Sequence, residues 1–294
     1  MQFLFIFVYN SAMWTLNYDS ISELDSTLKS KGLAMSKKFG QNFLISSKAR
    51  ERIVDYMALD DDMRVWEVGP GLGAITHLVL KKNVDLTAFE IDYGFAEILK
   101  EEAFKDEPRF SLVIGDALKM LFEYDYTPDR IIGNLPYNVG SVIIAKLIES
   151  SILPERMVFT LQSEVVERMC AKPGDDEYSS FSILTQIDYE NQNVLTLKKG
   201  CFWPQPQVES SVVVMAKRKE SLVSNELRSV FLPLVRALFS MRRKTIKNNL
   251  VGSFDINKTN VDSVLSKAGL TGKERAEVLT FDEIIRVAEV IKSY

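Results

Sequence analysis

Four apolar segments of the chain are each followed by a turn and then by a helical pattern. These segments, each typical of a strand buried on both faces, are residues 63–68, 84–89, 110–114 and 130–132. The polar or glycine residues that follow them are Gly69, Glu90, Asp116 and Asn134. In an open parallel sheet the carboxyl ends of the strands lie at one edge and form the ligand crevice. The pattern therefore predicts an α/β fold with a binding site at that edge.

The first of these turns is rich in glycine, because residues 69–73 read Gly-Pro-Gly-Leu-Gly. Glycines at a strand-to-helix turn allow the backbone to approach a ligand closely, so Gly69 and Gly71 are candidate ligand contacts. Dinucleotide-binding folds place the third glycine one residue later than this chain does. The spacing therefore argues against a nicotinamide oxidoreductase.

Carboxylates at the next two strand ends could complete a nucleoside site. Glu90 lies about 20 residues beyond the glycine turn, where a carboxylate can bind ribose hydroxyls in such folds. Asp116 is placed to accept a hydrogen bond from an adenine amino group. Taken singly, Glu90, Asp92 and Asp116 could each be a helix cap or a turn residue instead. Four polar strand ends in register favour the site.

The fourth strand leads into residues 133–138, Gly-Asn-Leu-Pro-Tyr-Asn. An exocyclic amine such as adenine N6 is a poor nucleophile because its lone pair is delocalised into the ring. The side-chain carbonyl of Asn134 and the backbone carbonyl of Leu135 or Pro136 could accept hydrogen bonds from its N–H groups. The Tyr137 ring could stack on the base. The segment predicts modification of an amino-purine nitrogen, although by itself it could also be a loop-forming turn.

The composition narrows the possible chemistry. The chain has 294 residues, 46% of them hydrophobic, which is enough for one large domain and a small one. Cys170 and Cys201 belong to no CxxC motif or Cys/His cluster, which argues against disulfides and a metal site and fits a reducing, cytoplasmic setting. The single histidine, His77, is expected in a helix as a surface or packing residue, so histidine-based catalysis has little support.

The net charge of −4 does not by itself indicate a nucleic-acid binder. The basic residues are nevertheless clustered, and a cluster can form a phosphate-binding surface or simply a solvated face. The clusters that we predict to bind nucleic acid are Lys37 and Lys38, and Arg242, Arg243, Lys244 and Lys247.

Residues 1–29 are interpreted as an N-terminal extension, with Met13 as a candidate start of translation. Their apolar residues 1–9 are far short of the ~20 residues that a membrane span requires, and they lack the features of a secretory signal. We therefore expect no membrane segment.

The rest of the chain is predicted to form an α/β domain over residues 30–217 and a helical domain over residues 218–294. A polar loop at residues 37–44 could cap the mouth of the site. The other predicted elements are helices at 47–59, 142–149, 164–169 and 179–189, strands at 157–161, 193–197 and 210–216, and C-terminal helices at 227–240, 242–250, 261–268 and 281–293. Phe202 and Trp203, beside two prolines, are expected to form a rigid aromatic edge.

As a set, these motifs resemble those of the bacterial small-subunit (16S) ribosomal RNA adenine N6,N6-dimethyltransferase family. The resemblance covers roughly residues 30–290. It is carried by Lys-Lys-Phe-Gly-Gln-Asn-Phe-Leu (37–44), Glu-Val-Gly-Pro-Gly-Leu-Gly (67–73), Glu-Ile-Asp (90–92), Gly-Asp-Ala (115–117), Asn-Leu-Pro-Tyr-Asn (134–138), Phe-Trp-Pro-Gln-Pro-Gln-Val-Glu-Ser (202–210), Arg-Arg-Lys-Thr-Ile-Lys-Asn-Asn-Leu (242–250) and Arg-Ala-Glu-Val-Leu-Thr (275–280).

The resemblance implies a Rossmann-like class I S-adenosylmethionine-dependent methyltransferase sheet with a small all-α C-terminal domain. The family transfers methyl groups to N6 of two adjacent adenosines in a hairpin near the 3′ end of small-subunit rRNA. A small-subunit precursor is thus the implied partner of a monomeric enzyme without a metal. The implied cofactor residues are Asn42, Leu44, Gly69, Gly71, Glu90, Asp116 and Asn134. The implied catalytic residues are Asn134, Leu135, Pro136, Tyr137 and Phe202, with the target adenine between Tyr137 and Phe202.

Three positions depart from the family pattern. Gln207 and Glu209 stand where a lysine and an aspartate are usual, and Gly140 replaces a serine or threonine. These changes concern RNA affinity and helix capping rather than the cofactor. Two alternatives remain open: a large-subunit rRNA adenine methyltransferase of the antibiotic-resistance type, which usually reads Asn-Ile-Pro-Tyr and lacks the Phe-x-Pro-x-Pro segment, and a non-catalytic ribosome assembly factor.

Overall fold

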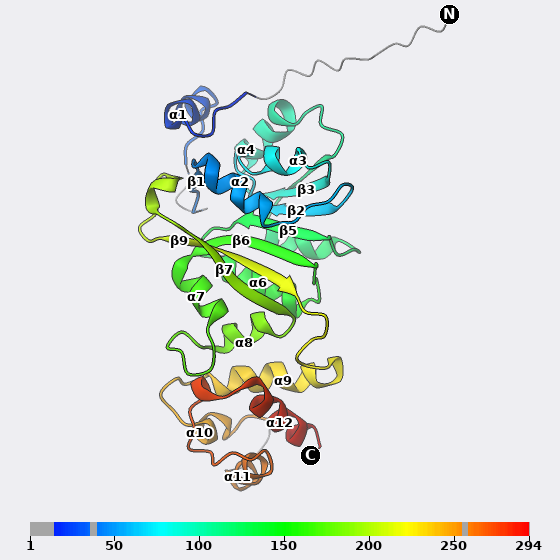
Figure 1. Ribbon diagram of the computed structural model, residues 1–294, viewed down its shortest axis with the longest axis vertical. Helices are drawn as coiled ribbons and strands as arrows, with labels where there is room; N and C mark the ends of the chain where they lie inside the picture. Colours follow the sequence, from blue (N-terminus) through cyan, green and yellow to red (C-terminus); the bar gives the residue numbers. More distant parts are fainter. Residues whose placement is uncertain (1–14, 36–39, 255–257, 294) are drawn as a thin grey trace, which may run out of the picture. The chain divides into compact units, whose positions relative to one another are not determined.

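Figure 1 shows the computed structural model, which describes residues 15–35, 40–254 and 258–293. The chain divides into two compact units. The first comprises residues 1–138 and 197–209, and the second comprises residues 139–196 and 210–294. The N-terminal apolar segment, Met13, Lys37 and Lys38 lie outside the described residues, so the predictions made for them stay predictions.

The main sheet has seven strands within the described ranges, four of them in the first unit. These four are β2 (Arg64–Val68), β3 (Asp85–Glu90), β4 (Phe110–Ile114) and β5 (Arg130–Asn134). They are parallel and lie in the order β4-β3-β2-β5. Val68 at the end of β2 is in register with Phe89 on one side and with Gly133 on the other. The predicted meeting of the polar strand ends at one edge is therefore confirmed.

The second unit contributes β6 (Arg156–Gln162), β7 (Tyr189–Leu197) and β9 (Ser210–Lys217), in the order β6-β9-β7. β6 and β9 are antiparallel, with Arg156 opposite Ala216 and Gln162 opposite Ser210. Both strands are almost continuously buried, since their residues are mainly valine, methionine and other apolar types. The sheet is thus mixed, with parallel pairing in the part that carries the predicted site.

Helices and one small sheet complete the first unit. The helices are α1 (Ile21–Ser30), α2 (Ser47–Asp55), α3 (Thr76–Leu80), α4 (Tyr93–Ile98) with a π-helical continuation over Leu99–Ala103, and α5 (Ala117–Met120). The small sheet is an antiparallel pair of short strands, β1 (Phe43–Leu44) and β8 (Phe202–Trp203). Figure 1 shows α1 in dark blue near the N-terminus of the described chain.

Helix α1 lies within the range that the sequence suggested is an extension. Ser20 caps it by accepting a hydrogen bond from the Glu23 backbone N–H. Leu24 and Leu28 are 1% and 2% exposed and belong to a buried cluster that includes Phe95 of α4. This helix is therefore a folded part of the first unit, and the interpretation of residues 1–29 as an extension missed it.

The second unit contains seven helices within the described residues, and five of them share one apolar core. The seven helices are α6 (Gly140–Glu149), α7 (Ser163–Cys170), α8 (Ser180–Gln186), α9 (Asn225–Leu238), α10 (Ile246–Leu250), α11 (Lys258–Lys267) and α12 (Phe281–Lys292), and the five that share the core are α8 to α12. Phe231 and Leu234 of α9, Val264 of α11 and Val287 of α12 are buried in one cluster. The prediction of a wholly helical C-terminal part is confirmed for the described residues.

Several predicted elements have different bounds in the structure, among them the strand expected over residues 193–197, which is β7 and begins at Tyr189. The helix expected over residues 47–59 ends at Asp55, and Ala58 takes a positive φ of 49°. The helix expected over 179–189 ends at Gln186, because Tyr189 already begins β7 and is fully buried. The helix expected over 242–250 begins only at Ile246, where the Thr245 hydroxyl caps it. In addition, the last two residues of the predicted loop at 37–44 form β1.

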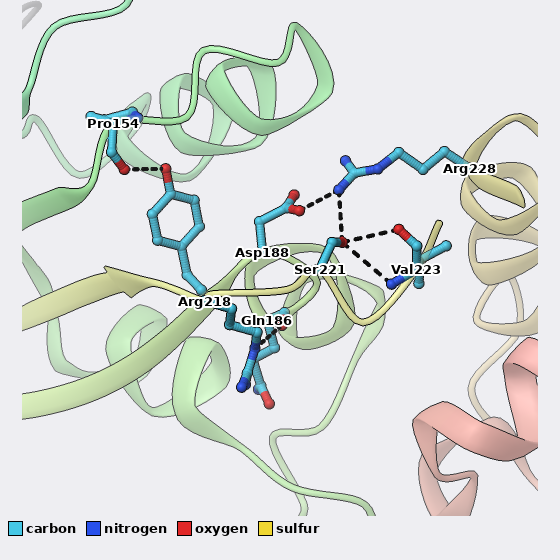
Figure 2. A network of polar contacts seen from close by, with 8 residues as sticks. Pro154, Gln186, Asp188, Arg218, Ser221, Val223 and Arg228 are labelled. Atoms are coloured by element: carbon cyan, nitrogen blue, oxygen red, sulfur yellow. Dashed lines mark hydrogen bonds and ion pairs between the residues drawn. The ribbon is translucent and has the colours of Figure 1, made fainter. Parts of the chain in front are cut away.

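A polar network ties the start of the C-terminal helices to the end of α8 (Figure 2). Asp188, which is buried, pairs with Arg228 of α9, and Arg228 also donates to the Ser221 hydroxyl at 3.0 Å. Arg218 donates from Nε to the Gln186 carbonyl at 3.1 Å. The bonds to Asp188 and to the Gln186 carbonyl cross the boundary predicted between residues 217 and 218, which stays a prediction.

Truncation of Leu28 tests whether α1 contributes to the stability of the first unit. Because Leu28 is 2% exposed, Leu28→Ala should lower the free energy of unfolding by about 2–5 kcal/mol. Urea denaturation measures this, with Lys29→Ala as a control on the exposed face of the same helix. An unchanged stability of Leu28→Ala would contradict the packing of α1.

Candidate functional site

The glycine turn after β2 requires its glycines for two separate reasons. Gly69, Gly71 and Gly73 have positive φ angles of 73°, 60° and 89°, which side-chain-bearing residues rarely adopt. A Cβ on Gly71 would lie 3.1 Å from the Phe43 ring, and one on Gly73 would lie 2.8 Å from the Phe104 ring. The turn is therefore both left-handed and closely covered by aromatic rings.

Glu90 is the last residue of β3, and its carboxylate supports the glycine turn. It accepts a hydrogen bond from the Gly71 backbone N–H at 3.0 Å and another from the Asp92 backbone N–H at 2.8 Å. Burial raises the pKa of Glu90 to about 7, against the lowering effect of these hydrogen bonds. Glu90 is thus a buried carboxyl whose two oxygens each accept one backbone hydrogen bond.

Asp92 and Asp116 are both helix caps, as the alternative interpretation held. Asp92 accepts hydrogen bonds from the backbone N–H groups of Gly94 and Phe95 at the start of α4. Asp116 accepts from the Leu118 backbone N–H at 2.9 Å and begins α5. Capping fixes the direction of each carboxylate and leaves the predicted role of Asp116 toward an adenine amino group as a prediction.

The amide of Asn134 is oriented by the loop that precedes α2. Its Nδ2 donates to the Asn42 backbone carbonyl at 2.9 Å. Because only the NH₂ group of an amide can donate to a carbonyl, this bond fixes which end of the amide is which. The Asn134 Oδ1 is therefore left as the acceptor, as the chemistry of an exocyclic amine requires.

Close backbone packing places Asn134 beside the glycine turn. A Cβ on Gly133 would come within 2.8 Å of the Val68 carbonyl, and one on Gly69 would lie 3.8 Å from the Asn134 carbonyl. Only glycine allows β5 to approach the end of β2 this closely at Gly133. The strand end that carries Asn134 and the turn that carries Gly69 therefore lie side by side.

The entrance loop, residues 40–44, is fastened to the site at several points. Gln41 Nε2 donates to the Asp92 carboxylate at 3.0 Å, and Arg50 Nη1 donates to the Leu44 carbonyl at 2.8 Å. Asn42 donates from its own side chain to the Gly40 carbonyl at 3.0 Å. Asn42 therefore lies beside Asn134, whereas Leu44 is buried in β1, and the cofactor roles predicted for both stay predictions. Gln41 and Arg50, which the sequence did not single out, hold this loop in place.

The aromatic residues at the site differ in exposure. Tyr137 is half-buried, whereas Phe202 is 1% exposed in β8, paired with Leu44 of β1. The neighbouring Trp203 is half-buried and stacks on Phe43 with ring centroids 6.1 Å apart. The Phe202 ring is covered in this structure, so stacking of a base between Tyr137 and Phe202 remains a prediction. Leu135 is buried and Pro136 half-buried.

Two of the four cations in the predicted RNA-binding run have ion pairs in the second unit. Arg242 donates to the Asp176 carbonyl and lies 3.8 Å from the Glu277 carboxylate, and Lys247 lies 2.7 Å from the Asp262 carboxylate. Arg243 and Lys244 are exposed and have no ion pair with any other residue that the structure describes. The basic run contains no acidic residue, so the sequence did not indicate these ion pairs. Their acidic partners lie in other segments of the chain.

A buried glutamate beneath the glycine turn was not among the predicted site residues. Glu67 in β2 is 2% exposed and accepts a hydrogen bond from the Thr76 hydroxyl at 2.7 Å. Burial, and next the nearby charge of Glu90, raise the pKa of Glu67 to about 8, although the bond from Thr76 lowers it. The sequence signal that could have identified Glu67 is a glutamate inside an otherwise apolar strand, because a buried charged residue is costly without a partner.

The structure also gives the positions of the residues that depart from the family pattern and of the single histidine. Gln207 and Glu209 are exposed, and Gly140 is the buried first residue of α6. His77 packs in α3 against Tyr18, so its role as a packing residue is confirmed. Within the described ranges, no group of three His, Cys, Asp or Glu side chains is arranged to hold a metal ion, and no helix is long and apolar enough to span a membrane.

A family model described as ribosomal RNA adenine dimethylase matches residues 32–293. The chain belongs to this family. The match includes residues of both units and all of the predicted cofactor residues, and it begins after α1. It confirms the predicted enzyme class, an rRNA adenine dimethyltransferase.

Curated relatives of this family match the chain over almost its full length. A "Ribosomal RNA small subunit methyltransferase A" of Treponema denticola is 44% identical over 281 residues, covering 94% of this chain and 96% of the relative. The protein of the same name from Bacillus pumilus is 36% identical and covers 90% of this chain and 94% of the relative.

Solved structures support the fold of this family member. A dimethyladenosine transferase from Plasmodium falciparum aligns with a TM-score of 0.71 at 22% identity, covering 82% of this chain and 94% of that chain. The 23S rRNA methyltransferase ErmE aligns with a TM-score of 0.65 at 23% identity, covering 85% and 99%. The predicted fold, a class I methyltransferase sheet with C-terminal helices, is confirmed.

Replacement of Glu67 by glutamine should change how stability depends on pH. The pKa of Glu67 is raised from 4.5 to about 8, so the folded state holds this proton more tightly than the unfolded chain. Its contribution is therefore fully present below pH 4.5 and is lost as the pH rises through 8. Glu67→Gln should gain stability relative to the unmodified protein over this range, by up to about 1.4 kcal/mol per pH unit.

Urea denaturation between pH 5 and pH 9 measures this difference. Glu51→Gln is the matched control, because Glu51 lies exposed on α2. Parallel stability curves for Glu67→Gln and the unmodified protein would show that Glu67 does not titrate in the range given.

Proposed function

We propose that this protein transfers methyl groups from S-adenosylmethionine to N6 of two adjacent adenosines near the 3′ end of small-subunit rRNA, giving N6,N6-dimethyladenosine. The observation that supports this most directly is the fixed amide of Asn134. Its Nδ2 is held by the Asn42 carbonyl, which leaves Oδ1 as an acceptor beside the glycine turn. An acceptor at that position suits the N–H groups of an exocyclic amine.

The crevice suits a cofactor with a nucleoside portion. Glu90 is a buried carboxyl with two backbone donors already in place, so its remaining acceptor capacity fits ribose hydroxyls. The left-handed glycine turn allows close approach of the cofactor, and Asp116 would accept from the adenine amino group. Asn42 and Leu44 would hold the cofactor from the entrance loop, and Asn134 would lie near its methionine end.

In the proposed reaction the chain contributes position and hydrogen bonding. Bound S-adenosylmethionine supplies an electrophilic methyl group on a sulfonium. The N6 lone pair forms the new N–C bond as the C–S bond breaks and its electrons pass to sulfur. The methylated nitrogen then loses a proton to water. Asn134 Oδ1 and the Leu135 or Pro136 carbonyl would hold the amine in line, and Tyr137 would stack on the base.

The choice of the small subunit rests on sequence likeness rather than on the crevice. The relatives named for the small subunit cover nearly the whole chain at 36–44% identity. Residues 134–137 read Asn-Leu-Pro-Tyr, and residues 202–206 keep the Phe-x-Pro-x-Pro pattern. We propose further that the enzyme acts as a monomer in the cytoplasm, on a precursor of the small subunit.

Methylation of ribosomal subunits that lack the modification tests this proposal. Labelled S-adenosylmethionine is supplied with small or large subunits, and the product nucleoside is identified by mass. We expect N6,N6-dimethyladenosine in the small subunit. Label confined to the large subunit would favour the antibiotic-resistance type of enzyme. Cofactor binding without any label would favour an assembly factor.

Replacement of Asn134 by alanine should abolish turnover. The change removes the proposed acceptor for the target amine, and the loss should exceed 100-fold in kcat, as for other groups that act on the reacting atoms. Circular dichroism and thermal unfolding check that the fold is kept. Asn138→Ala is the control, since this exposed asparagine follows the same segment. Full activity of Asn134→Ala would contradict the proposed role.

Reversal of Arg243 and Lys244, which have no ion pair to another described residue, should weaken RNA binding. Arg243→Glu/Lys244→Glu should lower affinity across RNA sequences and reduce the slope of log K against log salt by about 1 for each lost phosphate contact. Lys81→Glu/Lys82→Glu makes the same change in net charge at the end of α3, away from the site edge. If both variants weaken binding equally, the effect is general charge and the helical domain has another role.

A further inference from the structure

Tyr18, which precedes α1, reaches the glycine turn directly. Its hydroxyl donates to the Leu72 backbone carbonyl at 2.8 Å, although the two residues are far apart in sequence. The Tyr18 ring is 6% exposed and stacks on His77 with centroids 5.0 Å apart. A Cβ on Gly73 would lie 3.2 Å from the Tyr18 hydroxyl. The N-terminal segment therefore covers the part of the turn between Gly71 and Gly73.

Arg50 of α2 joins the same N-terminal segment to the entrance loop. Its Nη2 donates to the Asp19 carboxylate at 2.7 Å, and its Nη1 donates to the Leu44 carbonyl at 2.8 Å. The guanidinium also lies 5.7 Å from the centroid of the Tyr18 ring. Arg50 is 5% exposed, although the Asp19 side chain is 49% exposed, so the bond to the Leu44 carbonyl is buried and the ion pair is only partly desolvated.

We propose that Tyr18 and Arg50 are positioning residues for the cofactor site. Tyr18, in the segment before α1, donates to the glycine turn at Leu72. Arg50 of α2 joins Asp19 of that segment to the entrance loop at Leu44. Neither residue touches the reacting atoms. This inference rests on the proposed function, because it concerns the site assigned there to S-adenosylmethionine.

The glycine turn and the entrance loop contain little regular secondary structure, so contacts with other segments are needed to hold them in place. The glycine turn spans residues 69–75 without regular helix or strand, and β1 in the entrance loop is only Phe43–Leu44. Glycine-rich backbone loses much conformational entropy when it is fixed, so a turn that is held in advance binds a ligand more tightly. Burial of Leu24 and Leu28 anchors α1 and gives the support a rigid base.

The test is S-adenosylmethionine binding to the full-length protein, measured by calorimetry without RNA. Tyr18→Phe removes a single hydroxyl and should weaken binding about threefold to tenfold, the equivalent of one hydrogen bond. In methylation assays KM for the cofactor should rise by a similar factor, while kcat and KM for the ribosomal subunit stay within twofold.

A matched control exists in the second unit. The Tyr178 hydroxyl donates to the Leu279 carbonyl at 3.2 Å, so Tyr178→Phe loses the same kind of buried bond far from the proposed site residues in sequence. We expect it to reduce stability to a similar degree and to leave the cofactor dissociation constant unchanged. An equal loss of affinity in both variants would show a general stability effect and overturn the inference.

A second pair of variants tests the arginine without removing it. Asp19→Ala takes away a partner of Arg50, and Asp19→Asn keeps an acceptor oxygen at the same place. Alanine should weaken cofactor binding about threefold, and asparagine should restore it to within twofold of the unmodified protein. Unchanged binding in both Tyr18→Phe and Asp19→Ala would overturn the inference. If the unmodified protein itself fails to bind S-adenosylmethionine, the proposed function fails instead.

Discussion

Parallel pairing of β2 between β3 and β5 is the constraint on which the site depends. Because Val68 is in register with both Phe89 and Gly133, the residues that follow these three positions emerge at one edge. Glu90 and Asn134 are thereby brought together from distant parts of the chain. Gly133 makes this pairing possible at the end of β5, since a Cβ there would collide with the Val68 carbonyl.

Two carboxyl groups buried at this edge give the crevice its electrostatic character. Burial raises the pKa of Glu67 to about 8 and that of Glu90 to about 7, so both hold protons more tightly than exposed glutamates. A cofactor that donates hydroxyl hydrogens to Glu90 would stabilise its ionised form. Such donated hydrogen bonds would lower the pKa of Glu90, as those from the Gly71 and Asp92 backbone N–H groups already do.

Much of the fold and part of the site could be predicted from local patterns. Apolar segments followed by turns predicted the parallel strands, and the polar residues at the strand ends pointed to Glu90 and Asn134. Both predictions use the spacing of residue types, which is a local property of the chain. Helix α1 was not predicted, because Leu24 and Leu28 form only a short apolar stripe. Their burial depends on packing in a cluster with Phe95, which is distant in sequence. The exact end of α8 also escaped, because Tyr189 is drawn into β7 by pairing that the local pattern does not contain.

The sequence by itself determined the residue types at the strand ends, the glycine turn and the family. These follow from residue identity and spacing, which are fixed before the chain folds. Only the tertiary structure decided that the Asn42 carbonyl orients the Asn134 amide, that Phe202 is covered, and that partners from distant segments neutralise Arg242 and Lys247. Each of these is a contact between segments far apart in the chain, and its geometry exists only once the backbone has folded.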